Sequence, residues 1–121
     1  MTKKVLIIED NVDILEILRE LMSAEGYMVF EAFTGEEGMK IVKTIQMDLV
    51  LVDCKLPYKS GRNVIEFMRK DPALKSIPVI IISALDEYSN DSPDKSGYQA
   101  WINKPFDIHN VLQTVTMVMQ K

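Results

Sequence analysis

The residues of this sequence best suited to chemistry are three acids, one hydroxyl and one amine, each following a short apolar run. They are Glu9, Asp10, Asp53, Ser83 and Lys104. Clustered carboxylates repel one another and lose hydration on burial, so such a group needs a cation. Oxygen ligands favour a hard cation such as Mg²⁺, held by few carboxylates with waters and a phosphoryl oxygen. An amine and a hydroxyl suit the other side of a phosphoryl group, and a carboxylate can accept one.

The apolar runs that precede these residues predict the strands of a parallel sheet. The stronger runs lie at 5–8, 49–52 and 79–82, and weaker ones lie at 27–32 and 100–102. Uninterrupted runs rich in β-branched residues are typical of strands buried on both faces. Because ligands of open parallel sheets lie at the carboxyl ends of the strands, we expect the polar residues to meet at one edge. Taken singly, Asp10 or Asp53 could equally be a helix N-cap.

Amphipathic segments between the runs predict helices. Apolar residues at helical spacing indicate a helix over about 12–24, with Gly26 beyond its end. Thr34, Ser60 and Asp107 are expected N-caps of the later helices. The alternation of strands and helices predicts a doubly wound α/β fold over a single domain, residues 1–121.

One segment breaks the alternation. Residues 86–96 contain Pro93, no apolar stripe and several side chains that compete with helical hydrogen bonds. We therefore expect at most a turn or two of helix here.

Composition excludes several classes of protein. The chain is 47% hydrophobic and 26% charged, values typical of a globular protein. A net charge of −4 without a basic cluster argues against direct nucleic-acid binding. The single cysteine, Cys54, excludes an intrachain disulfide, and the apolar runs are too short for a membrane helix or a signal peptide. We expect a soluble, cytoplasmic protein without membrane contact.

The motifs around the polar residues are specific in combination. They read Ile7-Ile8-Glu9-Asp10-Asn11, Asp53-Cys54-Lys55-Leu56-Pro57 with Gly61, Ile82-Ser83-Ala84 and Lys104-Pro105-Phe106. In them the sequence resembles the receiver domain of two-component response regulators over essentially the whole chain. The resemblance implies a flavodoxin-like, five-stranded parallel sheet of order 2-1-3-4-5 with helices on both faces.

The resemblance also implies a role for each matching residue at the acidic edge. Asp53 matches the phosphoacceptor and a metal ligand, Asp10 the direct Mg²⁺ ligand, and Glu9 the acid that reaches Mg²⁺ through water. The backbone carbonyl of Lys55 matches the third protein ligand. The domain would catalyse only its own phosphotransfer and acyl-phosphate hydrolysis, so it is not otherwise an enzyme.

The phosphoryl group would come from a phosphohistidine of a sensor kinase or a phosphotransfer protein. Ser83 and Lys104 match the hydroxyl and the lysine that contact this group. The Lys104-Pro105 bond is expected to be cis, as in the family. The chain would act alone on a downstream effector, or as a piece of a longer protein with an output domain.

Some positions leave two interpretations open. Trp101 occupies the position of the family's aromatic switch, or it is simply a packed strand residue. Leu15, at the edge of the predicted apolar stripe, could form a docking patch with Pro105 and Phe106, or it could belong to the core. Lys55 could pair with Glu9 or shield the acyl phosphate, or it could be a solvated surface lysine.

Two other functions are compatible with the fold class. A flavodoxin-like electron carrier needs a first loop that cradles a flavin phosphate, but here that loop carries Glu9, Asp10 and Asp13. An aspartate-based phosphohydrolase needs a second acid two residues after the nucleophile, and that position is Lys55. Both are therefore disfavoured.

Overall fold

The computed structural model describes residues 2–120, in which strands and helices alternate up to the fourth strand. The strands are Lys4–Ile8 (β1), Met28–Ala32 (β2), Leu49–Val52 (β3), Val79–Ser83 (β4) and Ala100–Asn103 (β5). The α-helices are Val12–Ala24 (α1), Gly35–Thr44 (α2), Gly61–Lys70 (α3) and Ile108–Met119 (α4). A short 3₁₀ turn, Lys95–Gly97, precedes β5.

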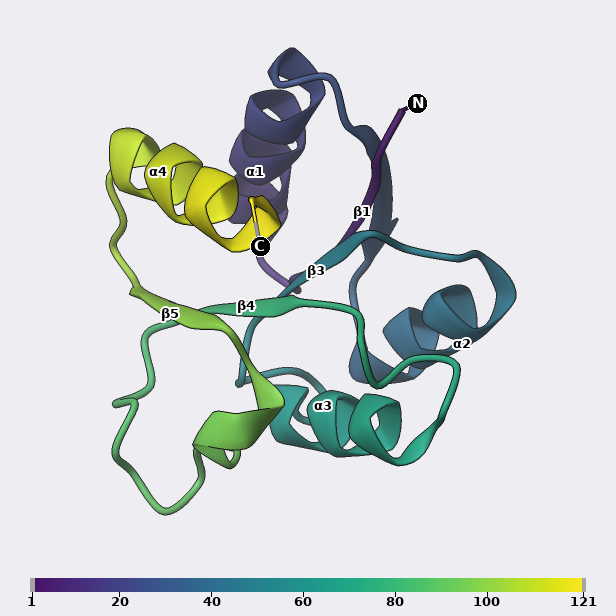
Figure 1. Ribbon diagram of the computed structural model, residues 1–121. Coiled ribbons are helices and arrows are strands. Elements are labelled where there is room, and N and C mark those ends of the chain that lie inside the picture. The colour runs from purple at the N-terminus through teal and green to yellow at the C-terminus, as the bar shows by residue number, and fades with distance from the viewer. Residues whose placement is uncertain (1, 121) are drawn as a thin grey trace.

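The strands form one parallel sheet between two layers of helices. Their order is β2-β1-β3-β4-β5, which confirms the predicted doubly wound topology. Figure 1 shows α1 and α4 on one face of the sheet and α2 and α3 on the other. No helix among residues 2–120 has the length and hydrophobicity needed to cross a membrane.

Burial on both faces explains the uninterrupted apolar strands. In β1, Val5 and Ile7 pack into the core beneath α1 and α4, whereas Leu6 and Ile8 pack beneath α2 and α3. All four are at most 1% exposed. Successive side chains of a strand point to opposite faces, so a strand between two helical layers must be apolar at every position.

The helices begin at the expected caps. Thr34 and Ser60 accept hydrogen bonds from the backbone N–H groups of Glu37 and Asn63, and Asp107 accepts one from His109. Such bonds satisfy amide groups that have no partner inside the helix. They fix where α2, α3 and α4 leave the edge of the sheet that carries the polar residues.

The orientation of α1 decides between the two interpretations of Leu15. Leu15, for which a surface patch and a core position were both left open, is 3% exposed and packs with Leu18 and Met22 against the sheet. Ile17, which lies at helical spacing from Ile14 and Leu21, is 42% exposed. The sequence of α1 holds two overlapping apolar stripes one residue apart, and packing against the sheet and α4 selects the stripe that contains Leu15.

The segment 86–96 contains no α-helix, as expected from its composition. Tyr98, which follows the 3₁₀ turn, is buried, and its hydroxyl donates a 2.9 Å hydrogen bond to Glu87. Its ring meets that of Trp101 edge-on, with centroids 5.7 Å apart. Arg69 on α3 donates a 3.0 Å hydrogen bond to the carbonyl of Gly97. Tyr98 and Arg69 therefore hold this part of the chain against α3 without a helix.

Candidate functional site

The carboxyl ends of β1 and β3 bring the three acids together. Glu9, Asp10 and Asp53 each offer a carboxylate oxygen, and these three oxygens lie within 4.8 Å of one another. Glu9 and Asp53 are buried, at 2% and 6% exposed, whereas Asp10 is exposed. The arrangement follows from the register, because Ile8 pairs with Val52 and places both strand ends side by side.

Lys104 lies between the two buried acids. Its Nζ is 2.6 Å from Glu9 Oε1 and 2.6 Å from Asp53 Oδ2. The lysine reaches them from the end of β5, where its backbone N–H donates to the carbonyl of Ser83. Lys104 therefore neutralises part of the charge that the two carboxylates bring into the protein.

Burial and ion pairing have opposite effects on the pKa values of Lys104 and Glu9. Burial alone would lower the pKa of Lys104, but its contacts with Asp53 and Glu9 outweigh this effect and leave the pKa raised. Burial raises the pKa of Glu9, against hydrogen bonds from Lys104 and the N–H of Asn11. The lysine therefore keeps its proton at neutral pH, while desolvation of Glu9 is only partly offset.

Backbone groups orient the acids. The N–H of Asn11 donates to Glu9 Oε2 at 3.1 Å, and the N–H of Lys55 donates to Asp53 Oδ1 at 3.1 Å. Gly61, at the start of α3, lies so close to the Asp53 carbonyl oxygen that an added Cβ would collide with it. A glycine is thus required where the helix approaches the end of β3.

Two further side chains lie at the strand ends. Ser83 is fully buried, and its hydroxyl accepts a 3.2 Å hydrogen bond from the N–H of Leu85. Cys54 is buried beside Asp53, and burial and that neighbouring charge raise the pKa of its thiol to about 11. The thiol therefore stays protonated at neutral pH and is a poor nucleophile.

A cleft of about 730 Å³ opens at this edge of the sheet. It is lined by Asp10 and by the loop after β3, including Lys55, and also by Leu85 and Asp91. Arg62 also lines the cleft, and it donates a 3.2 Å hydrogen bond to the carbonyl of Asn90. The segment 86–96 thus contributes Asp91 to the lining of a cleft that also reaches Asp10.

The remaining predicted residues lie around this edge. Lys55 is exposed, and in the part of the chain that the structure describes Lys104, not Lys55, pairs with Glu9. Trp101 is half-buried, and its indole N–H donates to Asn103. Pro105 is exposed and follows a cis peptide bond, whereas Phe106 is half-buried against the core. Leu15 is too buried to join a surface patch with them.

The chain resembles known proteins along almost its full length. A family model described as the response regulator receiver domain matches residues 5–116. The polar-differentiation response regulator DivK of Brucella ovis is 32% identical over 116 residues, which are 95% of this chain and 94% of that protein. The hybrid signal transduction histidine kinase D of Dictyostelium discoideum is 33% identical over 95% of this chain, a match covering 7% of that protein.

Solved structures share the fold. The receiver domain of a sensor histidine kinase from Pseudomonas aeruginosa, crystallised with a magnesium ion in its active site cleft, superposes with a TM-score of 0.90. The two chains are covered completely and are 20% identical. The receiver domain of a Francisella response regulator gives a TM-score of 0.85 at 29% identity, with 98% of each chain covered.

The position of Lys104 predicts a large effect on stability. Lys104→Met should lower the free energy of unfolding by about 3 kcal/mol at pH 7 with a chelator present, because two buried carboxylates lose their counter-charge. Urea denaturation measures the loss. Lys55→Met, at an exposed lysine, should change stability by less than about 0.5 kcal/mol. Adding Asp53→Asn to Lys104→Met should recover part of the loss. If Lys104→Met were as stable as the wild type, the lysine would not be the required counter-charge.

Proposed function

The chain belongs to the family of response regulator receiver domains, and from this premise we propose that residues 1–121 form one Mg²⁺-dependent phosphoacceptor domain. Its acceptor is Asp53, and its donor is a phosphohistidine of a sensor kinase or phosphotransfer protein. The observation that carries this proposal is the convergence of three carboxylates with the ammonium of Lys104 at one edge of the sheet.

The donor set fits a hard divalent cation. Three carboxylates from two strand ends concentrate more negative charge than one lysine neutralises, and every side-chain donor is an oxygen. Asp10 and Asp53 would hold the ion directly with the carbonyl of Lys55, and Glu9 would hold it through water. Bound Mg²⁺ would neutralise phosphoryl oxygens and so permit an anion to approach a carboxylate.

The transfer needs positioning rather than a base. Asp53 attacks the phosphorus with a carboxylate oxygen, so that a new O–P bond forms as the P–N bond to the donor histidine breaks. The bonding electrons remain on the imidazole nitrogen, which takes up a proton. Lys104 is already within 2.6 Å of Asp53 and would pair with a phosphoryl oxygen. Ser83, at the end of the neighbouring strand, would donate a hydrogen bond to another.

The donor protein would dock beside this edge, between α1 and α4. A groove of about 320 Å³ lies there, lined by Ile17, Leu21 and Ile108 among others. Ile17 and Ile108 are 42% and 51% exposed. Together with Pro105 and Phe106 they would form the apolar docking surface. Leu15 is too buried to contribute to it.

Phosphorylation should depend on Asp53 alone. With an acyl phosphate and Mg²⁺, the wild type should gain the mass of one phosphoryl group, and Asp53→Asn should gain none, because the nucleophile is lost. Intact-protein mass spectrometry measures this. Asp91→Asn removes a carboxylate from the cleft wall and should leave the labelling intact. Undiminished labelling of Asp53→Asn would show that another residue is the acceptor.

Metal binding should depend on Asp10. Asp10→Asn should weaken Mg²⁺ binding on the order of tenfold or more, since affinity follows the number of charged ligands. Without metal its melting temperature should equal or exceed that of the wild type, because one of three crowded charges is removed. Thermal melts over a Mg²⁺ titration test both points. Asp13→Asn makes the same change on the exposed first turn of α1 and should behave as the wild type. An unchanged Mg²⁺ response of Asp10→Asn would remove Asp10 from the ligand set.

Trp101 should report occupancy of the site. It is the only tryptophan, and its ring packs on Tyr98 beside β4, the strand that ends in Ser83. Its fluorescence should therefore change when Mg²⁺ and a phosphoryl mimic bind together. The change should be absent in Asp53→Asn and smaller in Ser83→Ala. If a bound mimic, detected by a raised melting temperature, left the spectrum unchanged, Trp101 would not be a switch.

A further inference from the structure

The loop between β3 and α3 holds one residue in a strained backbone conformation. Among residues 2–120, Tyr58 is the only non-glycine residue with a positive φ, at 65°. The N–H of Lys59 donates a 2.7 Å hydrogen bond to the carbonyl of Pro57, which closes a γ-turn around Tyr58. Turns of this hand are rare and strained, and a bulky side chain makes a positive φ less favourable still. The conformation of Tyr58 therefore lowers the stability of the folded chain.

The surroundings of this loop require a sharp turn, but they do not require a tyrosine. Ser60 caps α3, and the N–H of Gly61 donates to the carbonyl of Cys54 at 3.0 Å, so the chain must reverse its direction within a few residues. Glycine and asparagine adopt a positive φ more easily than tyrosine does. The local structure alone would therefore favour one of these two residues at position 58.

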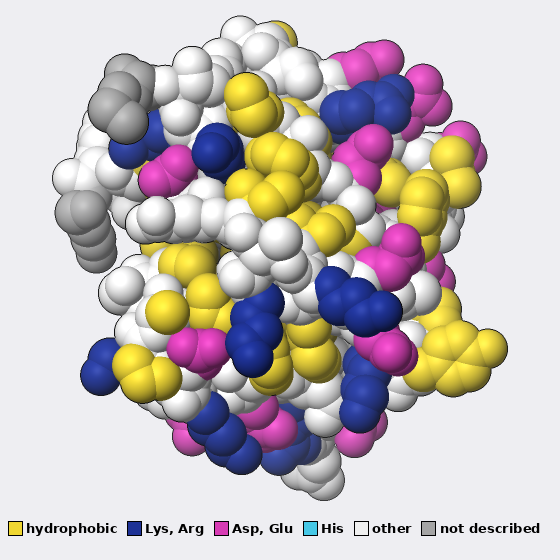
Figure 2. Space-filling view, turned by 90° about the vertical axis from the view of Figure 1, so that its right-hand side faces the viewer, with side chains coloured by type: hydrophobic (Ala, Val, Ile, Leu, Met, Phe, Trp, Pro, Cys, Tyr) yellow, Lys and Arg dark blue, Asp and Glu magenta, His cyan; other side chains and the backbone are white. Residues whose placement is uncertain are grey.

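The side chain of Tyr58 does not compensate for this strain by packing. Among the exposed large hydrophobic residues that the structure describes, Tyr58 has the largest exposed fraction, 96%. Exposure alone is ordinary, because Figure 2 shows hydrophobic side chains scattered among charged ones on the side that carries α2. Tyr88, at 75% exposed, has the ammonium of Lys95 4.5 Å from the centroid of its ring. Tyr58 is therefore unusual in combining a strained backbone with an almost fully solvated side chain.

A second exposed aromatic residue lies on the neighbouring loop. Phe33, between β2 and α2, is 46% exposed. Gly35, two residues later, approaches Lys59 so closely that an added Cβ would collide with it. The loops after β2 and β3 are therefore in contact at the side of the acidic edge where α2 and α3 begin. We call Phe33 and Tyr58 the aromatic flank.

We propose that the aromatic flank is a second contact for the protein that donates the phosphoryl group, and that Tyr58 is a specificity-determining residue for this donor. The inference rests on the proposed function. A protein donor must bring a histidine nitrogen close to Asp53, and even a single helix is about 10 Å wide. The loop that contains Tyr58 starts at Asp53, and Gly61 at its other end adjoins the Asp53 carbonyl oxygen. Such a donor must therefore cover this loop, whereas a partner that does not approach Asp53 need not.

The aromatic flank and the groove between α1 and α4 would contact the donor from opposite faces of the sheet. The groove is lined by aliphatic residues such as Ile17 and Ile108, whereas the flank offers two aromatic rings. Tyrosine is enriched among the residues that carry most of the energy of protein interfaces. A γ-turn that fixes the direction of the Tyr58 side chain also reduces the entropy lost on binding. Donor binding thus gives a physical reason for a tyrosine in an unfavourable turn.

A small donor and a set of protein donors with the same P–N bond test the proposal. The small donor is phosphoramidate, which releases ammonia, and the protein donors are the purified, phosphorylated histidine kinases and phosphotransfer proteins of the source organism. Tyr58→Asn removes the ring and tolerates a positive φ, so its melting temperature should not fall. Phosphoramidate should label it as fast as the wild type. Transfer from the protein donor that is fastest with the wild type should slow tenfold or more, and excess donor should restore the rate, since only docking is weakened.

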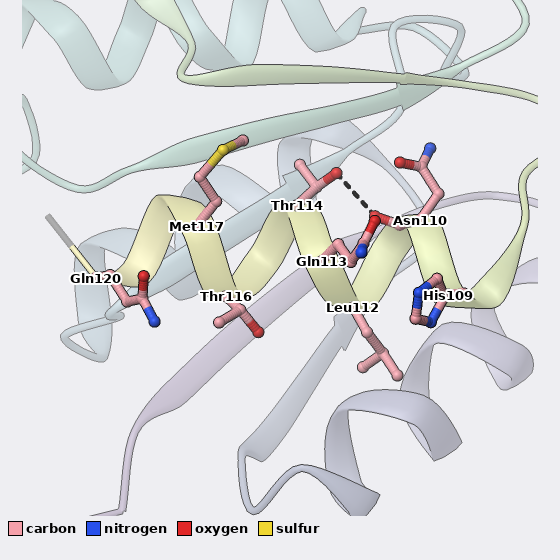
Figure 3. A pocket seen from close by; sticks show the side chains of 8 residues that line it. All are labelled: His109, Asn110, Leu112, Gln113, Thr114, Thr116, Met117 and Gln120. Carbon is pink, nitrogen blue, oxygen red and sulfur yellow. Dashed lines mark hydrogen bonds between the residues drawn. The ribbon is translucent and has the colours of Figure 1, made fainter.

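Met117→Ala is the matched control. Met117 is 58% exposed near the end of α4 (Figure 3), beside Pro78 and Gln99 at the opposite edge of the sheet, and the variant should accept from both kinds of donor at wild-type rates. Wild-type transfer from the protein donor to Tyr58→Asn would overturn the proposal, and so would an equal loss with phosphoramidate. If phosphoramidate labels the wild type but no protein donor does, the proposal fails together with its donor class. If neither labels Asp53, the proposed function itself is wrong, and the inference falls with it.

Discussion

Two carboxylates buried side by side are the constraint on which the rest of this structure depends. Glu9 and Asp53 are almost fully covered, and burying two carboxylates side by side is costly without a neighbouring positive charge. Lys104 meets this need by contacting both acids at once. One lysine still leaves an excess of negative charge at the strand ends, and that excess is the basis on which we propose a divalent cation at this edge. The same residues thus stabilise the folded chain and form its candidate functional site.

The sheet makes this arrangement possible because it brings distant parts of the sequence to one edge. Glu9, Asp53 and Lys104 are separated by dozens of residues, yet each follows a strand of the same parallel sheet. Strands covered on both faces are rigid and apolar, so the polar residues can only stand at their ends. The caps at Thr34, Ser60 and Asp107 then direct the helices away from the edge and leave it accessible.

The features that the sequence predicted are those that follow from local residue patterns and from the meeting of parallel strand ends at one edge of the sheet. The strands, the capped helices, the lack of a helix over 86–96 and the grouping of Glu9, Asp10, Asp53 and Lys104 were all predictable. The burial of Leu15 was not, because α1 carries two overlapping stripes and only tertiary packing chooses between them. The hydrogen bond from Arg69 to the Gly97 carbonyl was not predictable either, because the sequence around a charged helical residue does not indicate which distant group it will contact.

Because no α-helix lies between β4 and β5, a structural change at the acidic edge would reach a loop on this side of the sheet. In place of an α-helix, this part of the chain contains the buried side chain of Tyr98. Its ring contacts Trp101, and its hydroxyl donates a hydrogen bond to Glu87. Trp101 belongs to the strand that pairs with Ser83, so a change at the strand ends has a short packed route to Tyr98 and the segment 86–96. Through Asp91, that segment also lines the cleft that Asp10 and Cys54 line at the acidic edge. The lining of this cleft and the packing around Trp101 therefore involve the same part of the chain. A structural change at the acidic edge would therefore reach a loop here, whereas α4 lies on the other face of the sheet.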